Sequence, residues 1–224
     1  MPVNLKQQAG ERATTFVEDG MVVGLGTGST VFYAIRKLGE LARQGMQIKG
    51  VCTSVQTMDL AREYGIPVVE IEDTKCIDIT IDGADEVDPG GQGIKGRGGA
   101  LLFEKIVAAN SGQNIWVVEK RKLVQQLGAF PLPVEIIPFG HSKLIRKMEE
   151  WGWRPVLREK GSEIFTTDGH HYIVDLHLHS IPDPQQLNAE IIKIPGVVEH
   201  GLFLDTVNKV VAAGPDKVEI ISFR

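Results

Sequence analysis

The chain has 224 residues, a formal net charge of -5 and 42% hydrophobic residues, enough apolar material for one large domain or for a large and a small one. The mild acidity, with no basic stripe, argues against nucleic acid as the main partner. No apolar run approaches the ~18 residues that span a bilayer, and the polar N-terminal segment lacks a signal-peptide core, so we expect a cytoplasmic protein with no membrane partner.

Helical and extended patterns alternate along the first half of the chain, beginning with a helix that Asn4 can cap. A strand, a glycine-rich turn and a helix in succession are the first half of a parallel βαβ unit. Such units build a doubly wound sheet with ligands at the carboxyl ends of its strands. The expected helices are Leu5–Val17, Val31–Gln44, Val55–Tyr64 and Ala100–Ala109, and the expected strands are Met21–Leu25, Ile48–Cys52, Val68–Ile71, Cys76–Ile81 and Ile115–Val118, with Gln113–Asn114 and Glu119–Lys120 as loop residues.

The proline-rich segment 130–133 (FPLP) punctuates the chain like a domain boundary. The order of strand, helix, strands and helix after it predicts a small α+β domain inserted before the last part of the large sheet. We expect one domain from residues 1–130 plus 205–224 and another from residues 131–204. The expected elements are strands Val134–Ile137, Arg154–Arg158, Glu163–Thr166, Tyr172–His179, Lys209–Ala213 and Val218–Ser222, and helices His141–Trp151 and Pro184–Ile192.

The segment Gly24–Thr30, GLGTGST, is a glycine-rich turn between an expected strand and an expected helix. It is a poor dinucleotide fingerprint, because Ser29 stands where the GxGxxG pattern needs a glycine and no acidic residue ends the next strand. The P-loop lysine is missing too. Amides and the hydroxyls of Thr27, Ser29 and Thr30 at a helix N-terminus form a general anion site. Phosphate binding is therefore favoured over a nucleotide or a purely structural turn.

Asp82 and Asp85 lie around Gly83, just after an expected strand. Aspartate beside glycine forms turns, which is the plainest interpretation. The density of acidic residues also allows a divalent-metal site. A third interpretation is acid–base chemistry on a polyol. Lys95, in the glycine-rich segment that follows, favours the third, because a lysine beside carboxylates suits an alkoxide or enediolate better than another cation.

Glu104 falls in the expected helix that follows Gly98 and Gly99. A helical glutamate is usually solvated at the surface. Here apolar neighbours such as Leu102 and Phe103 would desolvate the carboxylate and raise its pKa, which is what a general base acting near neutrality needs.

Two further groups of residues are interpreted without a catalytic role. Asp175, His177 and His179 alternate along an expected strand and would share one face, but a polar strand face explains them as well as a metal site does. Cys52 and Cys76 are expected to be free thiols in a reducing compartment.

Five motifs follow one another along nearly the whole chain: GTGST (26–30), DGADEVD (82–88), KGRGGALLFEK (95–105), FPLPVEIIP (130–138) and IPGVVEHGLF (194–203). In this order and spacing the chain resembles the type A ribose-5-phosphate isomerase family. The resemblance implies a Rossmann-like doubly wound sheet with a smaller inserted α+β, ferredoxin-like domain. It also implies a homodimer or larger assembly and no metal or organic cofactor.

By this resemblance Glu104 is the proton-transferring base, and Asp82, Asp85 and Lys95 are also catalytic. Many members have glycine at the position of Arg97, so the side chain here either points to solvent or reaches the ligand. The substrate-binding residues that the resemblance implies are Lys6, Thr27, Gly28, Ser29, Thr30, Asp82, Gly83, Ala84, Asp85, Lys95, Gly96, Arg97, Gly98 and Lys122.

The combined expectation is an aldose–ketose isomerase of the non-oxidative pentose phosphate pathway, acting on D-ribose 5-phosphate and D-ribulose 5-phosphate through a cis-enediolate. Its partner would be the sugar phosphate alone, apart from a second copy of the chain. The alternatives are a non-catalytic sugar-phosphate sensor, and a sugar-phosphate deaminase or CoA transferase on a related fold. A sensor would need neither Glu104 nor Lys95, and it would usually carry a DNA-binding helix pair for which the sequence leaves no room.

Overall fold

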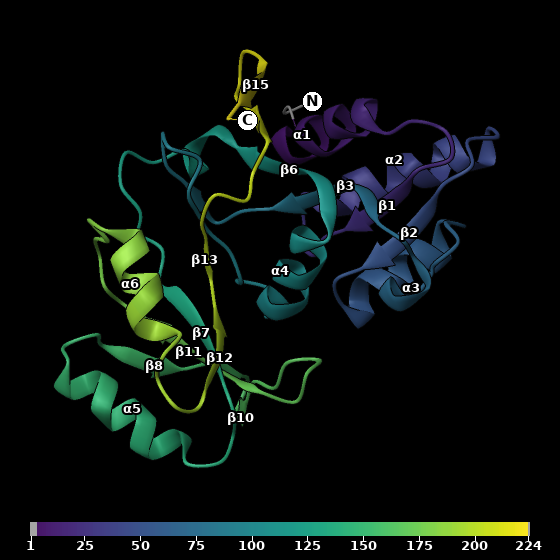
Figure 1. Ribbon diagram of the computed structural model, residues 1–224. Coiled ribbons are helices and arrows are strands. Elements are labelled where there is room, and N and C mark those ends of the chain that lie inside the picture. Colours follow the sequence, from purple (N-terminus) through teal and green to yellow (C-terminus); the bar gives the residue numbers. More distant parts are fainter. Residues whose placement is uncertain (1–3, 224) are drawn as a thin grey trace. The chain divides into compact units, whose positions relative to one another are not determined.

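A computed structural model describes residues 4–223, which form two compact units (Figure 1). Among these residues the first unit contains 4–84, Phe103–Leu123 and 206–223, and the second contains Asp85–Leu102 and Val124–Asp205. The expected domain boundaries at 130/131 and 204/205 stay a prediction. The compact units divide the chain differently at residues 85–102 and 124–130.

The first unit is built on a six-stranded sheet of order β15-β14-β6-β3-β1-β2. All neighbours pair in parallel except the antiparallel edge strand β15. The chain leaves β1 for the edge strand β2 and returns to β3 on the other side of β1, so the strand order reverses beside β1, where ligands of doubly wound sheets bind. The strands are β1 Val22–Leu25, β2 Lys49–Cys52, β3 Ile77–Gly83, β6 Ser111–Glu119, β14 Lys209–Ala213 and β15 Val218–Ser222.

Helices pack on both faces of this sheet. One buried cluster joins α1, α2 and α3 to alternate residues of the central strands, among them Val23 and Leu25 of β1. Val107 of α4 belongs to a separate cluster with Val51 and Ile77. A Cβ at Gly24 would lie 2.8 Å from Val107, so glycine lets α4 approach β1 closely. The helices are α1 Leu5–Ala13, capped by Asn4 as expected, α2 Val31–Arg43, α3 Val55–Glu63 and α4 Leu101–Ala109, with 3-10 turns η1 Thr14–Phe16 and η3 Lys120–Lys122.

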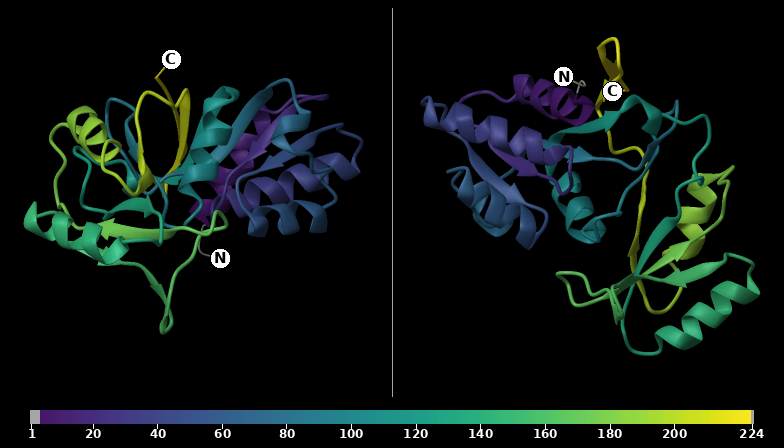
Figure 2. Two further views of the ribbon diagram at one scale, coloured as in Figure 1. Left: turned by 60° about the horizontal axis from the view of Figure 1, so that its bottom comes forward. Right: turned by 180° about the vertical axis from the view of Figure 1, so that it is seen from behind.

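The second unit contains an antiparallel four-stranded sheet of order β12-β7-β11-β8, with α5 and α6 (Figure 2). Leu132, Val134 and Ile136 alternate along β7 into a core shared with these helices, whereas Glu135 points to the other face. The elements are β7 Leu132–Ile136, α5 His141–Glu150, β8 Pro155–Leu157, β11 Tyr172–Leu176, α6 Pro184–Ile191 and β12 Val197–His200, with a hairpin of β9 Glu159–Lys160 and β10 Glu163–Ile164 and a small sheet of β4 Glu86–Val87, β5 Gly93–Ile94 and β13 Leu202–Phe203.

Three expectations about elements are wrong. Val68–Ile71 is not a strand: Val68 makes one isolated bridge to Gly50, and Ile71 begins a 3-10 turn, η2 Ile71–Asp73. Gln113, Asn114 and Glu119 belong to β6, because that strand pairs on both sides and extends beyond its apolar centre. The expected strand Tyr172–His179 ends at Leu176, and His179 has a φ of 63°, so Asp175, His177 and His179 do not share a strand face.

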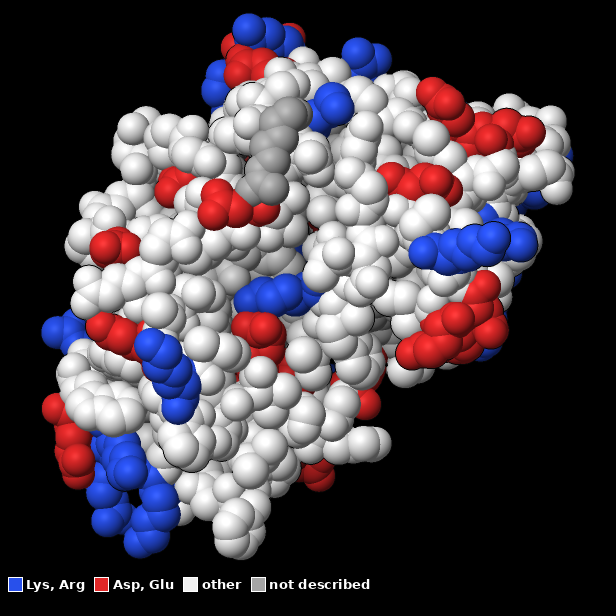
Figure 3. All heavy atoms as spheres, viewed as in Figure 1, with Lys and Arg blue, Asp and Glu red and all other residues white. Residues whose placement is uncertain are grey.

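Acidic and basic side chains are interspersed over the face drawn in Figure 3, in keeping with the small net charge. Within residues 4–223, every helix is too short or too polar to cross a membrane.

Candidate active site

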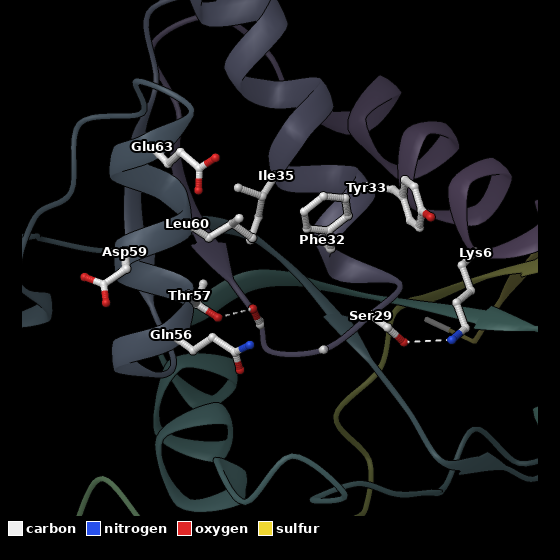
Figure 4. A pocket seen from close by; sticks show the side chains of 12 residues that line it. Lys6, Ser29, Phe32, Tyr33, Ile35, Gln56, Thr57, Asp59, Leu60 and Glu63 are labelled. Carbon is white, nitrogen blue, oxygen red and sulfur yellow. Dashed lines mark hydrogen bonds between the residues drawn. The ribbon is translucent and has the colours of Figure 1, made fainter.

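The loop between β1 and α2, residues 26–30, lies at the carboxyl end of β1 in the first unit. Gly28 has a φ of 131°, in the region that favours glycine. Lys6 of α1 donates a hydrogen bond from Nζ to Ser29 Oγ at 2.9 Å (Figure 4). Two of the predicted phosphate-binding residues, far apart in sequence, are thus brought together.

Thr27 is held by a cluster of hydroxyl groups, which we call the hydroxyl cluster: Thr27, Thr53, Ser54 and Thr57. The Thr27 hydroxyl donates to Ser54 Oγ at 2.7 Å and lies 2.9 Å from Thr53 Oγ1 and 3.1 Å from Thr57 Oγ1. Thr57 in turn donates to the carbonyl oxygen of Gly26 at 2.9 Å, so the cluster holds the loop by its backbone as well.

The sequence analysis missed Thr53, Ser54 and Thr57. Their position in the sequence could have indicated them. They follow β2 directly, just as the GTGST motif follows β1, and β1 and β2 are parallel neighbours. The carboxyl ends of such strands meet at one edge of the sheet. A second hydroxyl-rich segment at that edge was therefore a candidate partner.

Asp82 near the end of β3 is held against the same loop. Its Oδ1 accepts hydrogen bonds from the amides of Thr27 at 3.2 Å and Gly83 at 2.7 Å, and the residue is 2% exposed. A Cβ at Gly26 would lie only 2.0 Å from Asp82 Oδ1, so residue 26 must be glycine for the carboxylate to take this position. The loop and the predicted sugar-binding aspartate thus form one arrangement.

A cavity of about 760 Å³ opens beside this loop, between α2 and α3 (Figure 4). Phe32, Ile35 and Leu60 give it apolar walls. Its other lining residues are Lys6, Gly26, Gly28, Ser29, Tyr33, Gln56, Thr57, Asp59 and Glu63.

Lys122 ends the 3-10 turn η3 directly after β6, in the first unit. A hydrogen bond from Arg121 lowers the pKa of Glu119, and the positive charges of Lys6 and Lys122 lower it further. Both ammonium groups are therefore within electrostatic reach of one carboxylate at the end of β6. The predicted phosphate-contacting lysines converge on the same region.

Glu104 lies in the first turn of α4 and is only 3% exposed. Its predicted apolar neighbours Leu102 and Phe103 are half-buried, and Leu101 beside them is fully buried. The carboxylate is thus withdrawn from bulk water, as the sequence analysis expected of a general base.

The second unit carries Asp85 and the segment Lys95–Gly98, which we call the glycine loop. Asp85 accepts hydrogen bonds from the amide of Arg97 at 3.1 Å and from its Nε at 3.0 Å. The Arg97 guanidinium also lies over the Phe130 ring, 4.5 Å from its centroid. Its side chain is 66% exposed, so Arg97 has partners within the protein although much of it faces solvent.

Lys95 is the most deeply buried cation of the glycine loop, at 2% exposure. Its Nζ lies 5.0 Å from the centroid of the Phe203 ring, an arrangement that stabilises a cation away from water. A buried ammonium group is rare and usually has a functional partner.

The predicted residues thus fall into two sets. Lys6, the loop 26–30, Asp82–Ala84, Glu104 and Lys122 belong to the first unit, and Asp85 with the glycine loop belongs to the second. Among the described residues, no group of three or more histidine, cysteine, aspartate or glutamate side chains is arranged to hold a metal ion.

The chain matches the family model of ribose 5-phosphate isomerase A (phosphoriboisomerase A) over residues 49–217. It is 49% identical to the ribose-5-phosphate isomerase A of Listeria innocua, over 98% of this chain and 99% of the relative, and 49% identical to that of Bifidobacterium longum, over 97% and 95%. Among solved structures, the ribose 5-phosphate isomerase A of Methanocaldococcus jannaschii aligns with a TM-score of 0.92 at 38% identity, over 97% of this chain and 98% of that one. A D-ribose-5-phosphate isomerase in complex with phospho-erythronic acid aligns with a TM-score of 0.93 at 38% identity, over 97% of both chains. These matches confirm the resemblance: the chain belongs to the ribose 5-phosphate isomerase A family.

Proposed function

We propose that this isomerase interconverts D-ribose 5-phosphate and D-ribulose 5-phosphate through a cis-enediolate, with Glu104 as the general base. Glu104 takes the proton from C2 of the open-chain aldose and returns it to C1. A second proton moves from O2 to O1, so the atoms balance with no oxidant or reductant. The observation that carries the proposal is the burial of a carboxylate, Glu104, and an ammonium group, Lys95, at positions where the family motifs stand.

The phosphate end of the substrate is bound by Thr27–Thr30 with Lys6 and Lys122. Hydroxyl donors, a positively polarised helix N-terminus and two lysines suit a dianion. Binding energy gained at the phosphate, remote from the reacting carbons, holds the substrate in the reactive orientation.

The charge that develops on the sugar oxygens needs stabilisation, because a carboxylate is a weak base for a C–H bond. Lys95 and the amides of the glycine loop supply it, and one such preorganised donor is typically worth about 2.7–4 kcal/mol. Asp82 moves protons at the sugar oxygens and assists ring opening, while Asp85 holds a sugar hydroxyl and orients Lys95. Gly83, Ala84, Gly96, Arg97 and Gly98 complete the predicted sugar contacts.

One solved relative supports an intermediate of this kind. Its ligand, phospho-erythronic acid, is a four-carbon phosphate that ends in a planar carboxylate. A carboxylate resembles the planar, oxygen-rich end of an enediolate, and a site complementary to a transition state binds such mimics tightly.

We further propose a cytoplasmic homodimer that acts in the non-oxidative pentose phosphate pathway and needs no cofactor. We also propose domains of residues 1–130 plus 205–224 and of residues 131–204.

One assay distinguishes this isomerase from a sugar-phosphate sensor, a deaminase or a CoA transferase. Only the isomerase forms the ketose when the protein is incubated with ribose 5-phosphate alone.

Glu104→Gln tests the base. The amide keeps the size of the side chain but cannot take a proton, so kcat should fall by roughly 10³-fold, within the roughly 10²–10⁴-fold that a positioned acid–base group contributes. Ribulose 5-phosphate formation is followed directly, and entry of solvent deuterium at C1 reports the transfer. Isomerisation that survives within tenfold of the parent rate would place the base elsewhere. Glu150→Gln, at the exposed end of α5, is the matched control.

A further inference from the structure

The glycine loop has no regular secondary structure of its own, so its neighbours must set its orientation. Gly96 has a φ of 112° and Gly99 a φ of 81°, conformations that favour glycine. The amide of Lys95 donates to the carbonyl of Gly201 at 2.9 Å, which fixes only the start of the loop.

Arg158, between β8 and β9 of the same unit, holds the middle of this loop. Its Nη1 donates to the carbonyl oxygen of Gly96 at 2.8 Å and to that of Arg97 at 3.2 Å. Its Nε and Nη2 donate to the two carboxylate oxygens of Asp175, at 2.8 and 2.5 Å. The guanidinium side chain is 14% exposed and its partner 19%, so water screens this pair little.

The peptide group between Gly96 and Arg97 is held at both ends. Its carbonyl oxygen accepts from Arg158, and its N–H donates to Asp85. A planar peptide group with both polar ends bonded cannot rotate without breaking one of the bonds.

Arg158 holds the next peptide group, between Arg97 and Gly98, through its carbonyl oxygen. No peptide bond among residues 4–223 is cis, and in a trans peptide the N–H points opposite to the C=O. The N–H of Gly98 therefore points away from Arg158.

We propose that Arg158 is a positioning residue for the isomerisation: anchored by Asp175, it orients the peptide groups of the glycine loop and, through them, the amide donors and Lys95 that stabilise the sugar oxyanion. This inference rests on the proposed function. Arginine suits the role because one planar group carries five donors and binds a carboxylate and two carbonyls at once, which lysine cannot do.

Arg158→Gln and Arg158→Lys test the proposal, with Arg146→Gln on the exposed side of α5 as the matched control. For Arg158→Gln we expect kcat to fall roughly 10- to 100-fold, less than the roughly 10²–10³-fold cost of losing an oxyanion donor outright, while KM for ribose 5-phosphate changes less than about threefold. KM holds because the phosphate is bound by other residues. Arg158→Lys keeps a positive charge beside Asp175 and should recover part of kcat.

Amide hydrogen exchange provides a readout that does not depend on activity. The peptide covering residues 95–99 should exchange faster in Arg158→Gln than in the parent protein, and at the parent rate in Arg146→Gln. If the parent chain fails to isomerise ribose 5-phosphate, the proposed function is wrong, and the exchange experiment still tests the positioning.

A folded Arg158→Gln protein that keeps either the parent kcat or the parent exchange rate overturns the inference. Should this variant fail to fold, Asp175→Asn takes its place, since it removes the charge that anchors Arg158 and leaves the arginine in the chain. For Asp175→Asn we then expect a smaller fall in kcat and a smaller rise in the exchange rate of residues 95–99. If either change is absent, the inference is overturned.

Discussion

Single residues of the site differ in how far the sequence could predict them. The pairing of Gly26 with Asp82 is invisible in the sequence, because it depends on the adjacency of β1 and β3, which places a carboxylate where a Cβ at residue 26 would stand. For Arg97 the sequence allowed a side chain that points to solvent or one that reaches the ligand. The structure adds a hydrogen bond from Arg97 to Asp85. Side chains whose role depends on a partner far along the chain are those that residue patterns predict least well.

The two cysteines should differ strongly in reactivity. Burial raises the pKa of Cys52 from 9.0 to about 11, with Arg62 opposing the shift, whereas Cys76 is exposed. At pH 9 we expect iodoacetamide to label the exposed Cys76 readily and Cys52 roughly 50-fold more slowly than a thiol of pKa 9.0, since only the thiolate reacts. Peptide mass spectrometry measures both rates.

The same pKa sets the sign of a stability effect. From pH 9 towards 11 the unfolded thiol loses its proton while the folded one keeps it, so this group lowers stability as the pH rises and has no effect well below pH 9. In urea the two cysteines should react alike. Equal rates in the folded protein would mean that the Cys52 thiol is accessible and its pKa ordinary.

At the scale of elements, the hydrophobic periodicity of the sequence predicts the helices and parallel strands of the first unit. It fails for Val68–Ile71. Apolar residues there read as a strand, but the segment lies beyond the edge strand β2 and finds only one bridging residue. The reverse holds for Asn114, a polar residue inside β6. Its amide side chain donates a hydrogen bond to the carbonyl of Ala108 at 2.9 Å. Such contacts satisfy the polar side chain within the strand, although the residue type by itself suggests a loop.

Thr57, at the start of α3, should support the loop that follows β1. Thr57→Val keeps the shape of the side chain but removes the hydrogen bond to the Gly26 carbonyl, so we expect the free energy of unfolding to fall by about 1–3 kcal/mol. KM for ribose 5-phosphate should rise, because Thr27 loses a support. Urea titration and steady-state kinetics measure the two effects.

Two controls bracket this experiment. Thr57→Ser restores the hydroxyl and should behave like the parent protein. Thr15→Val makes the same change at an exposed threonine of the 3-10 turn η1. An unchanged KM in Thr57→Val, with Thr57→Ser also unchanged, would show that the hydroxyl cluster does not support substrate binding.

For the whole molecule, the fold class followed from the alternation of helices and strands and from motifs in matching order, and the structural matches confirm it. Local patterns could not give the division of the chain into compact units. That division depends on contacts between distant segments, such as the pairing of β5 with β13.

Ribose 5-phosphate should stabilise the folded protein, because a ligand that binds only the native state adds free energy of unfolding. At 100 times its Kd the gain is about 2.7 kcal/mol, seen as a higher thermal unfolding midpoint. Ribose without the phosphate should protect much less, and inorganic phosphate should protect partly. Equal protection by ribose and ribose 5-phosphate would contradict the phosphate-binding role of the loop 26–30 and the two lysines.

The hydroxyl cluster has a further consequence for how an anion is received. Each hydroxyl has one proton to give and lone pairs to accept with, and Thr27 now gives its proton to Ser54. On anion binding we expect Thr27 to turn its proton outward, and its oxygen then to accept from Thr53 or Ser54, which now donate to the Leu25 carbonyl and to Thr57 Oγ1. Thr57 keeps its hydrogen bond to the Gly26 carbonyl, so the hydroxyls facing the anion reorient by rotation about C–O bonds while the backbone of the loop stays held.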